Sequence, residues 1–325
     1  MNKPLIVAEL GANHMGSYER AHKILSAAAK AGADAFKVQV WSPDTMCVDP
    51  TYVISEGAWK GRGMMDLYRE CFTPWEWLPE LFDAAYTRDL IPFASVFDEA
   101  SVDYMERLNV EMYKVASYEL VDLNLLRRVA ATGKRAVLST GAATLDEISA
   151  AVTQFENDQD VTLLHCVSEY PSKPEQANLA TMLDLAHLGC DFGLSDHSMG
   201  AGVAVAAATM GASVIEKHLT LRRADGGPDA GFSMEPEEFA LMCDAVRQAA
   251  VAVGHVQYIK KPTRLRRSLW IAKDATAGEV ITQAHIRTAR PALGIDCALR
   301  EQLPGKRFLV DVKAGTPLTA PIFGD

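Results

Sequence analysis

The chain has 325 residues, 49% of them hydrophobic, which is enough for one large domain with a substantial core and a small second domain. Its formal net charge of −10 argues against nucleic acid or an anionic membrane as the main partner, and no apolar run is long enough to span a bilayer. Six scattered cysteines without a C-x-x-C pair, and a start without a signal peptide, predict a cytoplasmic protein with reduced thiols.

Short β-rich segments recur along the first two thirds of the chain, separated by segments whose apolar residues have helical spacing. Repeated alternation of strand and helix predicts parallel strands joined by right-handed crossovers. Eight such units within about 250 residues match the size of a (β/α)8 TIM barrel. The eight segments are LIVAELG from Leu5, AFKVQV from Ala35, IPFASVF from Ile91, MYKVAS from Met112, AVLST from Ala136, VTLLHCV from Val161, DFGLSDH from Asp191 and VIEKHLT from Val214.

The segment 41–90 is too long for one crossover helix and is rich in Gly, Pro and aromatic residues. It follows the second predicted strand, so we expect it on the catalytic face as a lid or a substrate wall. Thr73, Pro74 and Glu76 fit an N-cap, a proline at the first helical position and an acid in the first turn. We therefore predict that a helix begins next to Thr73.

After the last helical pattern, PEEFALMCDAVRQAAVAVG, the composition becomes basic and polar. The expected boundaries are a catalytic barrel at 1–255, a linker at 256–267 and a second domain at 268–325. Short β-like runs broken by Gly and Pro predict a small, irregular domain near the lower size limit for independent folding. Such a domain is expected to lean on a partner surface.

Each predicted strand ends in polar side chains, and in a barrel of this type these ends form the active site. In chain order they are Asn13 and His14; Lys37 and Gln39; Ser95; Lys114, Ser117 and Glu119; Ser139 and Thr140; His165, Ser168, Glu169 and Tyr170; Ser195, Asp196 and His197; and Glu216 and His218.

Two of these residues, Lys37 and Lys114, carry positive charge among many hydroxyl donors. Lysine and hydroxyl groups suit a phosphorylated or carboxylated substrate, whose oxygens only accept hydrogen bonds. The alternative is that both lysines are structural and pair with Glu9 or Glu216 inside the barrel. Two lysines within a ring of hydroxyls favour the anion site.

His197 and His218 end neighbouring predicted strands at the same height, so their imidazoles could converge on one ion. Two neutral histidines with oxygen ligands suit a divalent transition metal. The alternative for each is a histidine bonded to a backbone carbonyl. His14 and His165 stay open between a general base, a substrate contact and simple packing.

Several motifs together resemble the sialic acid synthase (nonulosonate synthase) family over nearly the whole chain. The most specific are GLSDHS and VIEKHLT followed by GGPD, and the others are ELGANHMGS, FKVQV, YKVASYE, STGAATLDEI, LLHCVSEYP and RRSLWIAKDATAGEVIT with RPALG. The resemblance implies a barrel followed by an antifreeze-like (SAF) domain. It also implies condensation of phosphoenolpyruvate with an open-chain acetamido sugar, giving a nine-carbon acid and phosphate by C–O cleavage. The family forms a domain-swapped homodimer.

The resemblance also assigns roles to individual positions. His197 and His218 match the ligands of a divalent metal, usually Mn²⁺, which would polarise the sugar aldehyde. The positions that hold the phosphate and carboxylate are matched by Lys37, Ser95, Lys114, Ser117, Ser139 and Ser195. We count His197, His218, Lys114 and Lys37 as catalytic, and the further substrate-binding candidates are Asn13, Gln39, Ser168, Tyr170, Asp229 and, from the other subunit, Arg290.

Two departures from the family bear on the sugar. Met15 stands where synthases that use N-acetylmannosamine have a glutamate, and Ser168 stands where they have an asparagine. A thioether cannot accept hydrogen bonds from hydroxyls, so a less hydroxylated sugar is indicated. The stretch from Ile54 to Phe82 resembles the pseudaminic acid synthase branch, whose substrate is 2,4-diacetamido-2,4,6-trideoxy-L-altrose.

Other functions stay open at this point. An N-acetylneuraminate or legionaminic acid synthase would keep the family and change the sugar. A non-catalytic carbohydrate-binding barrel would have lost a histidine or the lysines, and all of these are present. A divalent-metal aldolase acting on a phosphosugar would differ in reaction class, and its Schiff-base variant would be trapped by borohydride.

Overall fold

The computed structural model describes residues 3–156, 160–258 and 263–325 of the chain. It divides into two compact units, one that ends at Gly254 and one that begins at His255. The predicted linker at 256–267 includes residues 259–262, which lie outside the described residues.

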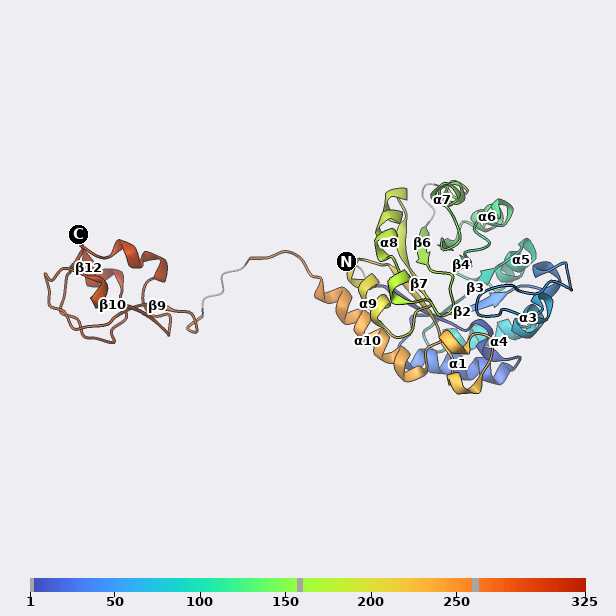
Figure 1. The fold of residues 1–325 in the computed structure, drawn as a ribbon, viewed down its shortest axis with the longest axis horizontal. Helices are drawn as coiled ribbons and strands as arrows, with labels where there is room; N and C mark the ends of the chain where they lie inside the picture. Colours follow the sequence, from blue (N-terminus) through green and yellow to red (C-terminus); the bar gives the residue numbers. More distant parts are fainter. Residues whose placement is uncertain (1–2, 157–159, 259–262) are drawn as a thin grey trace. The chain divides into compact units, whose positions relative to one another are not determined.

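The first unit is a closed barrel of eight parallel strands, in which each strand pairs with its neighbours in sequence and β1 pairs with β8 (Figure 1). The predicted TIM barrel is therefore confirmed. The strands are β1 (Leu5–Glu9), β2 (Ala35–Val40), β3 (Ile91–Val96), β4 (Met112–Val115), β5 (Arg135–Ser139), β6 (Val161–Cys166), β7 (Asp191–Asp196) and β8 (Val214–His218).

Helices surround the barrel, and most of them bury apolar side chains against the strands. In the first of them the Ser17 hydroxyl caps the helix by accepting from the Arg20 N–H, and Ile24 and Leu25 are fully buried. The helices are α1 (Tyr18–Lys30), α2 (Pro43–Met46), α3 (Met64–Cys71), α4 (Leu78–Tyr86), α5 (Glu99–Arg107), α6 (Leu123–Ala130), α7 (Leu145–Val152), α8 (Leu179–Asp184), α9 (Gly202–Thr209) and α10 (Pro236–Ala252).

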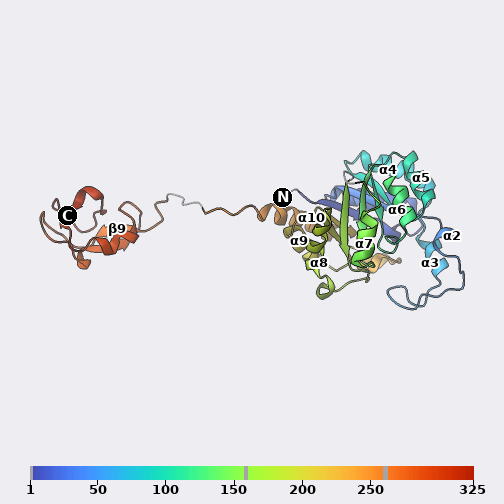
Figure 2. The same ribbon diagram turned by 90° about the horizontal axis from the view of Figure 1, so that it is seen from above.

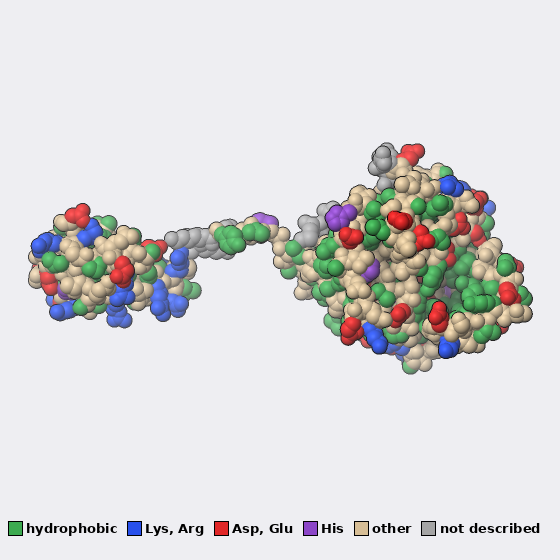
Figure 3. All heavy atoms as spheres, turned by 45° about the horizontal axis from the view of Figure 1, so that its top comes forward, with side chains coloured by type: hydrophobic (Ala, Val, Ile, Leu, Met, Phe, Trp, Pro, Cys, Tyr) green, Lys and Arg blue, Asp and Glu red, His purple; other side chains and the backbone are tan. Residues whose placement is uncertain are grey.

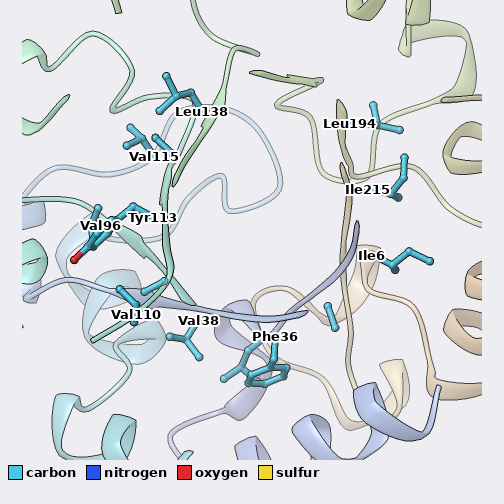
Figure 4. Close-up of a cluster of buried hydrophobic side chains, with 14 of the residues drawn as sticks. Ile6, Phe36, Val38, Val96, Val110, Tyr113, Val115, Leu138, Leu194 and Ile215 are labelled. Carbon is cyan, nitrogen blue, oxygen red and sulfur yellow. The ribbon is translucent and has the colours of Figure 1, made fainter. Parts of the chain in front are cut away.

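The main core lies between the strands and these helices. Figure 4 shows buried side chains that belong to strands all around the barrel, among them Ile6, Phe36, Leu138 and Ile215. A second and smaller apolar cluster fills the barrel itself. We call it the barrel floor, and its buried members are Val7, Ala35, Phe93, Met112, Val137, Leu164 and Val214.

The segment between β2 and β3 carries α2, α3, a 3-10 turn (Trp75–Trp77) and α4, as its length indicated. Figure 2 shows α2 and α3 at one end of the barrel, with the loop of this segment extending beyond them. The predicted helix start is wrong in detail, because Thr73 caps no helix. Its hydroxyl lies 3.3 Å from His14 Nε2, the 3-10 turn begins two residues later, and the α-helix begins at Leu78.

The second unit has a core of its own, built from residues such as Leu269, Ile271, Phe308 and Leu318. Its strands are short and paired antiparallel, and 3-10 turns connect them. The strands are β9 (Ser268–Ile271), β10 (Ile286–Ala289), β11 (Arg307–Phe308) and β12 (Phe323–Gly324). Across the described residues of both units, no helix is long and apolar enough to cross a membrane.

Candidate active site

A polar cavity lies above the barrel floor, at the carboxyl ends of the strands. It measures about 430 Å³ including the space at its mouth. Strand alternation produces it, because on most strands an inward-facing apolar residue is followed two positions later by a polar one. Val7 is followed by Glu9, and Met112 by Lys114. Figure 3 shows the barrel unit hollowed on the face it presents, with hydrophobic side chains around the hollow.

Lys37 is buried and ion-paired on the cavity wall. Its Nζ lies 2.7 Å from Glu9 Oε2 and 3.5 Å from Glu216 Oε1, and it donates to Ser95 Oγ at 2.8 Å. Burial alone would lower the pKa of Lys37, but these carboxylates raise it, so the side chain is a firmly charged ammonium. The structural alternative considered for Lys37 thus has its partners, although the residue still lines the cavity.

Lys114 differs from Lys37 in having no acidic partner. Its Nζ donates to Ser139 Oγ at 2.7 Å and to the Val115 carbonyl at 2.9 Å. No carboxylate of the described chain lies within 4.0 Å of it, and burial lowers its pKa. A buried ammonium bonded only to neutral groups is a ready binding site for an anion.

Further hydrogen-bonding groups line the same cavity. Ser117 Oγ accepts from the Gly141 N–H at 3.3 Å, and Ser195 Oγ donates to Glu216 Oε1 at 3.2 Å. Gln39 Nε2 donates to Glu9 Oε1 at 2.7 Å, which orients that carboxylate toward Lys37. The predicted hydroxyl ring around the lysines therefore exists in the fold.

His197 and His218 lie side by side, with ring centroids 5.6 Å apart. The register that pairs Asp196 with Lys217 puts the two histidines level, as the sequence predicted. His197 Nδ1 is 2.8 Å from the Val167 carbonyl, and His218 Nδ1 is 3.6 Å from an Asp229 carboxylate oxygen. The Val167 carbonyl thus holds His197 at Nδ1, whereas His218 Nδ1 makes no hydrogen bond and only faces the Asp229 carboxylate. Neither Nε2 atom has a protein partner in the described chain, so each is left to bind a ligand.

The support behind His218 depends on a glycine. Gly11 has a φ of +50°, and a Cβ there would lie 2.3 Å from Asp229 Oδ2 and 2.8 Å from His218 Nδ1. The same Asp229 oxygen accepts from the Ala12 N–H at 2.8 Å. Only glycine leaves room for this carboxylate beside the imidazole.

These groups fit a divalent transition metal. Burial lowers the pKa of His218 well below its usual value, so its imidazole is neutral and able to bind a metal. Among the described residues no cluster of three His, Cys, Asp or Glu side chains is placed to hold an ion. The protein would therefore supply two imidazoles, with oxygens of water or substrate as the remaining ligands.

An aromatic wall borders the histidines, and we define it as Trp59, Tyr170 and Phe232. The Tyr170 ring lies 4.3 Å from the His197 ring and 4.9 Å from the Phe232 ring, measured between centroids. Phe232 lies 4.9 Å from His218, and Trp59 lies 5.2 Å from Tyr170. Trp59 comes from the segment between β2 and β3, so that segment packs against Tyr170, which lines the cavity.

Some of the predicted residues lie outside the cavity lining. Asn13 is buried and donates to Ser233 Oγ at 2.8 Å, and Ser168 Oγ lies 4.0 Å from the Cys166 sulfur. Asp229 acts behind His218. Arg290 belongs to the second unit, and its role stays a prediction.

The two open histidines are held by the fold. His14 Nδ1 accepts from the Gly16 N–H at 3.0 Å, and its Nε2 lies 3.3 Å from the Cys71 carbonyl. His165 Nε2 lies 2.7 Å from the Ala177 carbonyl. The packing interpretation accounts for both.

Other lining residues had no role in the sequence prediction. Cys166 and Tyr118 line the cavity, and Cys166 Sγ lies 3.8 Å from His197 Nδ1. Glu216 was predicted at the end of its strand and also as a partner of the lysines, whereas Glu9 was considered only as such a partner. Period-two alternation from Val7 and Val214 already points both carboxylates inward, and that signal could have placed them in the cavity.

Comparisons with known proteins agree with this architecture. The NeuB family model matches residues 24–258, and the SAF domain model matches residues 266–322. The chain is 39% identical to the pseudaminic acid synthase of Helicobacter pylori, over 98% of each chain, and 33% identical to an N,N'-diacetyllegionaminic acid synthase of Campylobacter jejuni, over 94% of this chain and 96% of the other. A crystal structure of an N-acetylneuraminic acid synthetase from Leptospira borgpetersenii superposes with a TM-score of 0.73 at 29% identity, covering 80% of this chain and 88% of the other.

Proposed function

This chain belongs to the NeuB family, and from that premise we propose that it is a phosphoenolpyruvate-dependent pseudaminic acid synthase. C3 of phosphoenolpyruvate would form a bond to the aldehyde carbon of 2,4-diacetamido-2,4,6-trideoxy-L-altrose. Water would add to C2, and the bond between C2 and the phosphate oxygen would break. The observation that carries the proposal is one cavity holding both an unpaired buried ammonium and two buried imidazoles.

The lysine side of the cavity suits phosphoenolpyruvate. Lys37 alone cannot neutralise the carboxylate and phosphate of this substrate, because its positive charge is already paired with the carboxylates of Glu9 and Glu216. Lys114 supplies the additional cation, with Ser117 and Ser139 as hydrogen-bond donors. Fixed cations in a closed site would stabilise the charge that develops on the departing phosphate.

The histidine side suits the sugar aldehyde, with Mn²⁺ as the proposed ion. When bound there, such an ion supplies a Lewis acid for the carbonyl oxygen. His197 and His218 would hold it through Nε2, with the Val167 carbonyl bonded to the His197 ring and the Asp229 carboxylate beside the His218 ring. Burial raises the pKa of Asp229 to about 6, which is consistent with a dry pocket around these groups.

The choice of sugar rests on the relatives and on Met15. Met15 packs beside Gly227: a Cβ added to Gly227 would lie 3.1 Å from Met15 Cγ. The Met15 side chain is 42% exposed. A thioether next to the GGPD loop offers no hydrogen-bond acceptor of the kind a glutamate provides. A legionaminic acid synthase is the second candidate, supported by the 33% identical relative.

The proposal extends to a homodimer with exchanged C-terminal units, in which Arg290 faces the acyl group of the partner's substrate. The unit from His255 onward carries 12 Lys and Arg against 6 Asp and Glu, whereas the barrel unit carries 20 against 36. Opposite net charges favour docking of one unit on the other. A cytoplasmic location is part of the proposal, and the six free cysteines support it.

Phosphate release tests this function. The enzyme is supplied with phosphoenolpyruvate, Mn²⁺ and either the trideoxy altrose or N-acetylmannosamine, each with and without EDTA. We expect turnover of the altrose that EDTA abolishes. Turnover of N-acetylmannosamine alone would contradict the sugar assignment, and turnover that resists EDTA would contradict the metal. If neither sugar supports phosphate release, the pseudaminic acid assignment is contradicted. Release that occurs only with the legionaminic acid precursor would contradict it as well.

A further inference from the structure

Trp59 stands out in the loop that carries it. Residues 55–58 and 60–61 are exposed, whereas Trp59 is half-buried. Its indole N–H donates to the Pro228 carbonyl at 3.1 Å, which fixes the ring across 169 residues of sequence. An exposed loop that directs one large aromatic side chain inward gives that side chain a specific position.

The position is the outer end of the aromatic wall. Trp59 lies 5.2 Å from Tyr170 and 6.4 Å from Phe232, and these two rings continue to His197 and His218 respectively. The wall therefore runs without a break from the two histidines to the segment between β2 and β3.

The chemistry of this wall is apolar. The indole N–H of Trp59 is already used by Pro228, and Phe232 has no polar atom. Tyr170 faces Trp59 and Phe232 with its ring and carries the one hydroxyl of the wall. A hydroxyl of the substrate that met Trp59 and Phe232 would lose its bond to water, whereas a methyl group would bury apolar surface.

The loop that receives Trp59 also supports the metal ligands. Gly226 and Gly227 have φ values of 79° and 109°, a backbone that other residues rarely adopt. Pro228 then accepts from Trp59, and Asp229 lies next to His218. One short loop thus contacts both Trp59, at the outer end of the wall, and His218.

We propose that Trp59 is a specificity-determining residue that, with Phe232 and Tyr170, selects sugars whose terminal carbon is a methyl group rather than a hydroxymethyl group. The inference rests on the proposed function, because it assigns the recognition of the deoxygenated end of that same sugar. Discrimination by an apolar wall is modest, about 10- to 200-fold for one such group.

The test compares kcat/KM for 2,4-diacetamido-2,4,6-trideoxy-L-altrose and for its 6-hydroxy analogue, 2,4-diacetamido-2,4-dideoxy-L-altrose, in the wild type, Trp59→Ala and Trp59→Phe. We expect Trp59→Ala to lower the ratio of the two values about 10-fold, with the KM for phosphoenolpyruvate unchanged within about twofold. Trp59→Phe keeps an aromatic face and should retain most of the preference.

Trp75→Phe is the matched control, because the Trp75 indole N–H donates to the Trp41 carbonyl at 3.0 Å and its ring packs on Tyr104 instead of Tyr170. It should leave the ratio unchanged. A wild type that prefers the trideoxy sugar, with an unchanged ratio in Trp59→Ala, would overturn the role of Trp59 alone. So would an equal change in Trp75→Phe, or a loss confined to the KM for phosphoenolpyruvate. A wild type that converts neither of these sugars would overturn the proposed function as well.

Discussion

The floor and the active layer of this barrel lie on the same strands, two residues apart. Val7 and Met112 pack in the floor, and Glu9 and Lys114 stand one inward position further along. Both layers are buried. Burial of the apolar floor lowers the free energy of the folded state, whereas each buried charge in the layer above costs free energy unless ion pairs or hydrogen bonds offset it. The contrast shows that one backbone pattern serves packing at one level and chemistry at the next.

Within the active layer, the two lysines differ in how their buried charge is compensated. Lys37 is compensated by Glu9 and Glu216, whereas Lys114 is bonded only to neutral oxygens. We infer that Lys37 has mainly a structural role, as the partner of the two buried carboxylates. Lys114 has mainly a binding role, as the cation for the substrate anion.

The largest expected effect is on stability, in Lys37→Met. The substitution leaves two buried carboxylates without their cation, so the free energy of unfolding should fall by about 3–5 kcal/mol. Urea denaturation measures it. Adding Glu9→Gln to Lys37→Met should restore part of the loss, because it removes one of the unpaired charges. A variant as stable as the wild type would contradict the structural role of this ion pair.

Lys114→Met should show the opposite profile. Its stability should fall less than that of Lys37→Met, because Lys114 forms no direct ion pair and the two carboxylates keep Lys37 as their partner. Its kcat/KM for phosphoenolpyruvate should fall by about 10²- to 10³-fold, the usual cost of removing a group that stabilises developing charge. Lys30→Met, on the exposed side of α1, is the control and should change neither quantity. If Lys114→Met loses stability but keeps its activity, the distinction between the two lysines is wrong.

A smaller effect is expected on the pH dependence of stability, and it comes from the buried, neutral imidazole of His14. Burial lowers its pKa to about 4, and its Nδ1 accepts a backbone N–H. Between pH 6.5 and 4 the unfolded chain takes up a proton that the folded chain does not, so stability contributed by the neutral ring is complete above pH 6.5 and is lost as the pH falls toward 4. The loss relative to His14→Gln should be about 3 kcal/mol.

Urea unfolding of the wild type and of His14→Gln from pH 4 to pH 8 checks this linkage. The exposed His187, replaced by Gln, provides the control and should leave the pH dependence unchanged. A stability difference between wild type and His14→Gln that stays constant with pH would show that His14 titrates normally in the folded protein.

The strands and most of the cavity could be predicted because both follow short-range rules. Alternation along a strand predicts which side chains share a face, and the barrel brings all carboxyl ends together. Lys37, Lys114, His197 and His218 were found in this way.

Loop geometry could not be predicted, because it depends on partners far away in the sequence. Thr73 looks like an N-cap, but its hydroxyl meets His14 instead. Asn13 turns to Ser233, and Trp59 turns to Pro228. No local pattern encodes these choices, since each partner comes from another strand–helix connection.

The central claim is that this cavity joins phosphoenolpyruvate to an acetamido sugar. The most direct measurement is mass spectrometry of the products formed from phosphoenolpyruvate and 2,4-diacetamido-2,4,6-trideoxy-L-altrose with Mn²⁺, alongside the phosphate released. We predict one phosphate for each nine-carbon acid, whose mass equals sugar plus phosphoenolpyruvate plus water minus phosphoric acid. Phosphate accompanied by pyruvate and unchanged sugar would contradict the account, because the cavity would then hydrolyse phosphoenolpyruvate without forming a carbon–carbon bond.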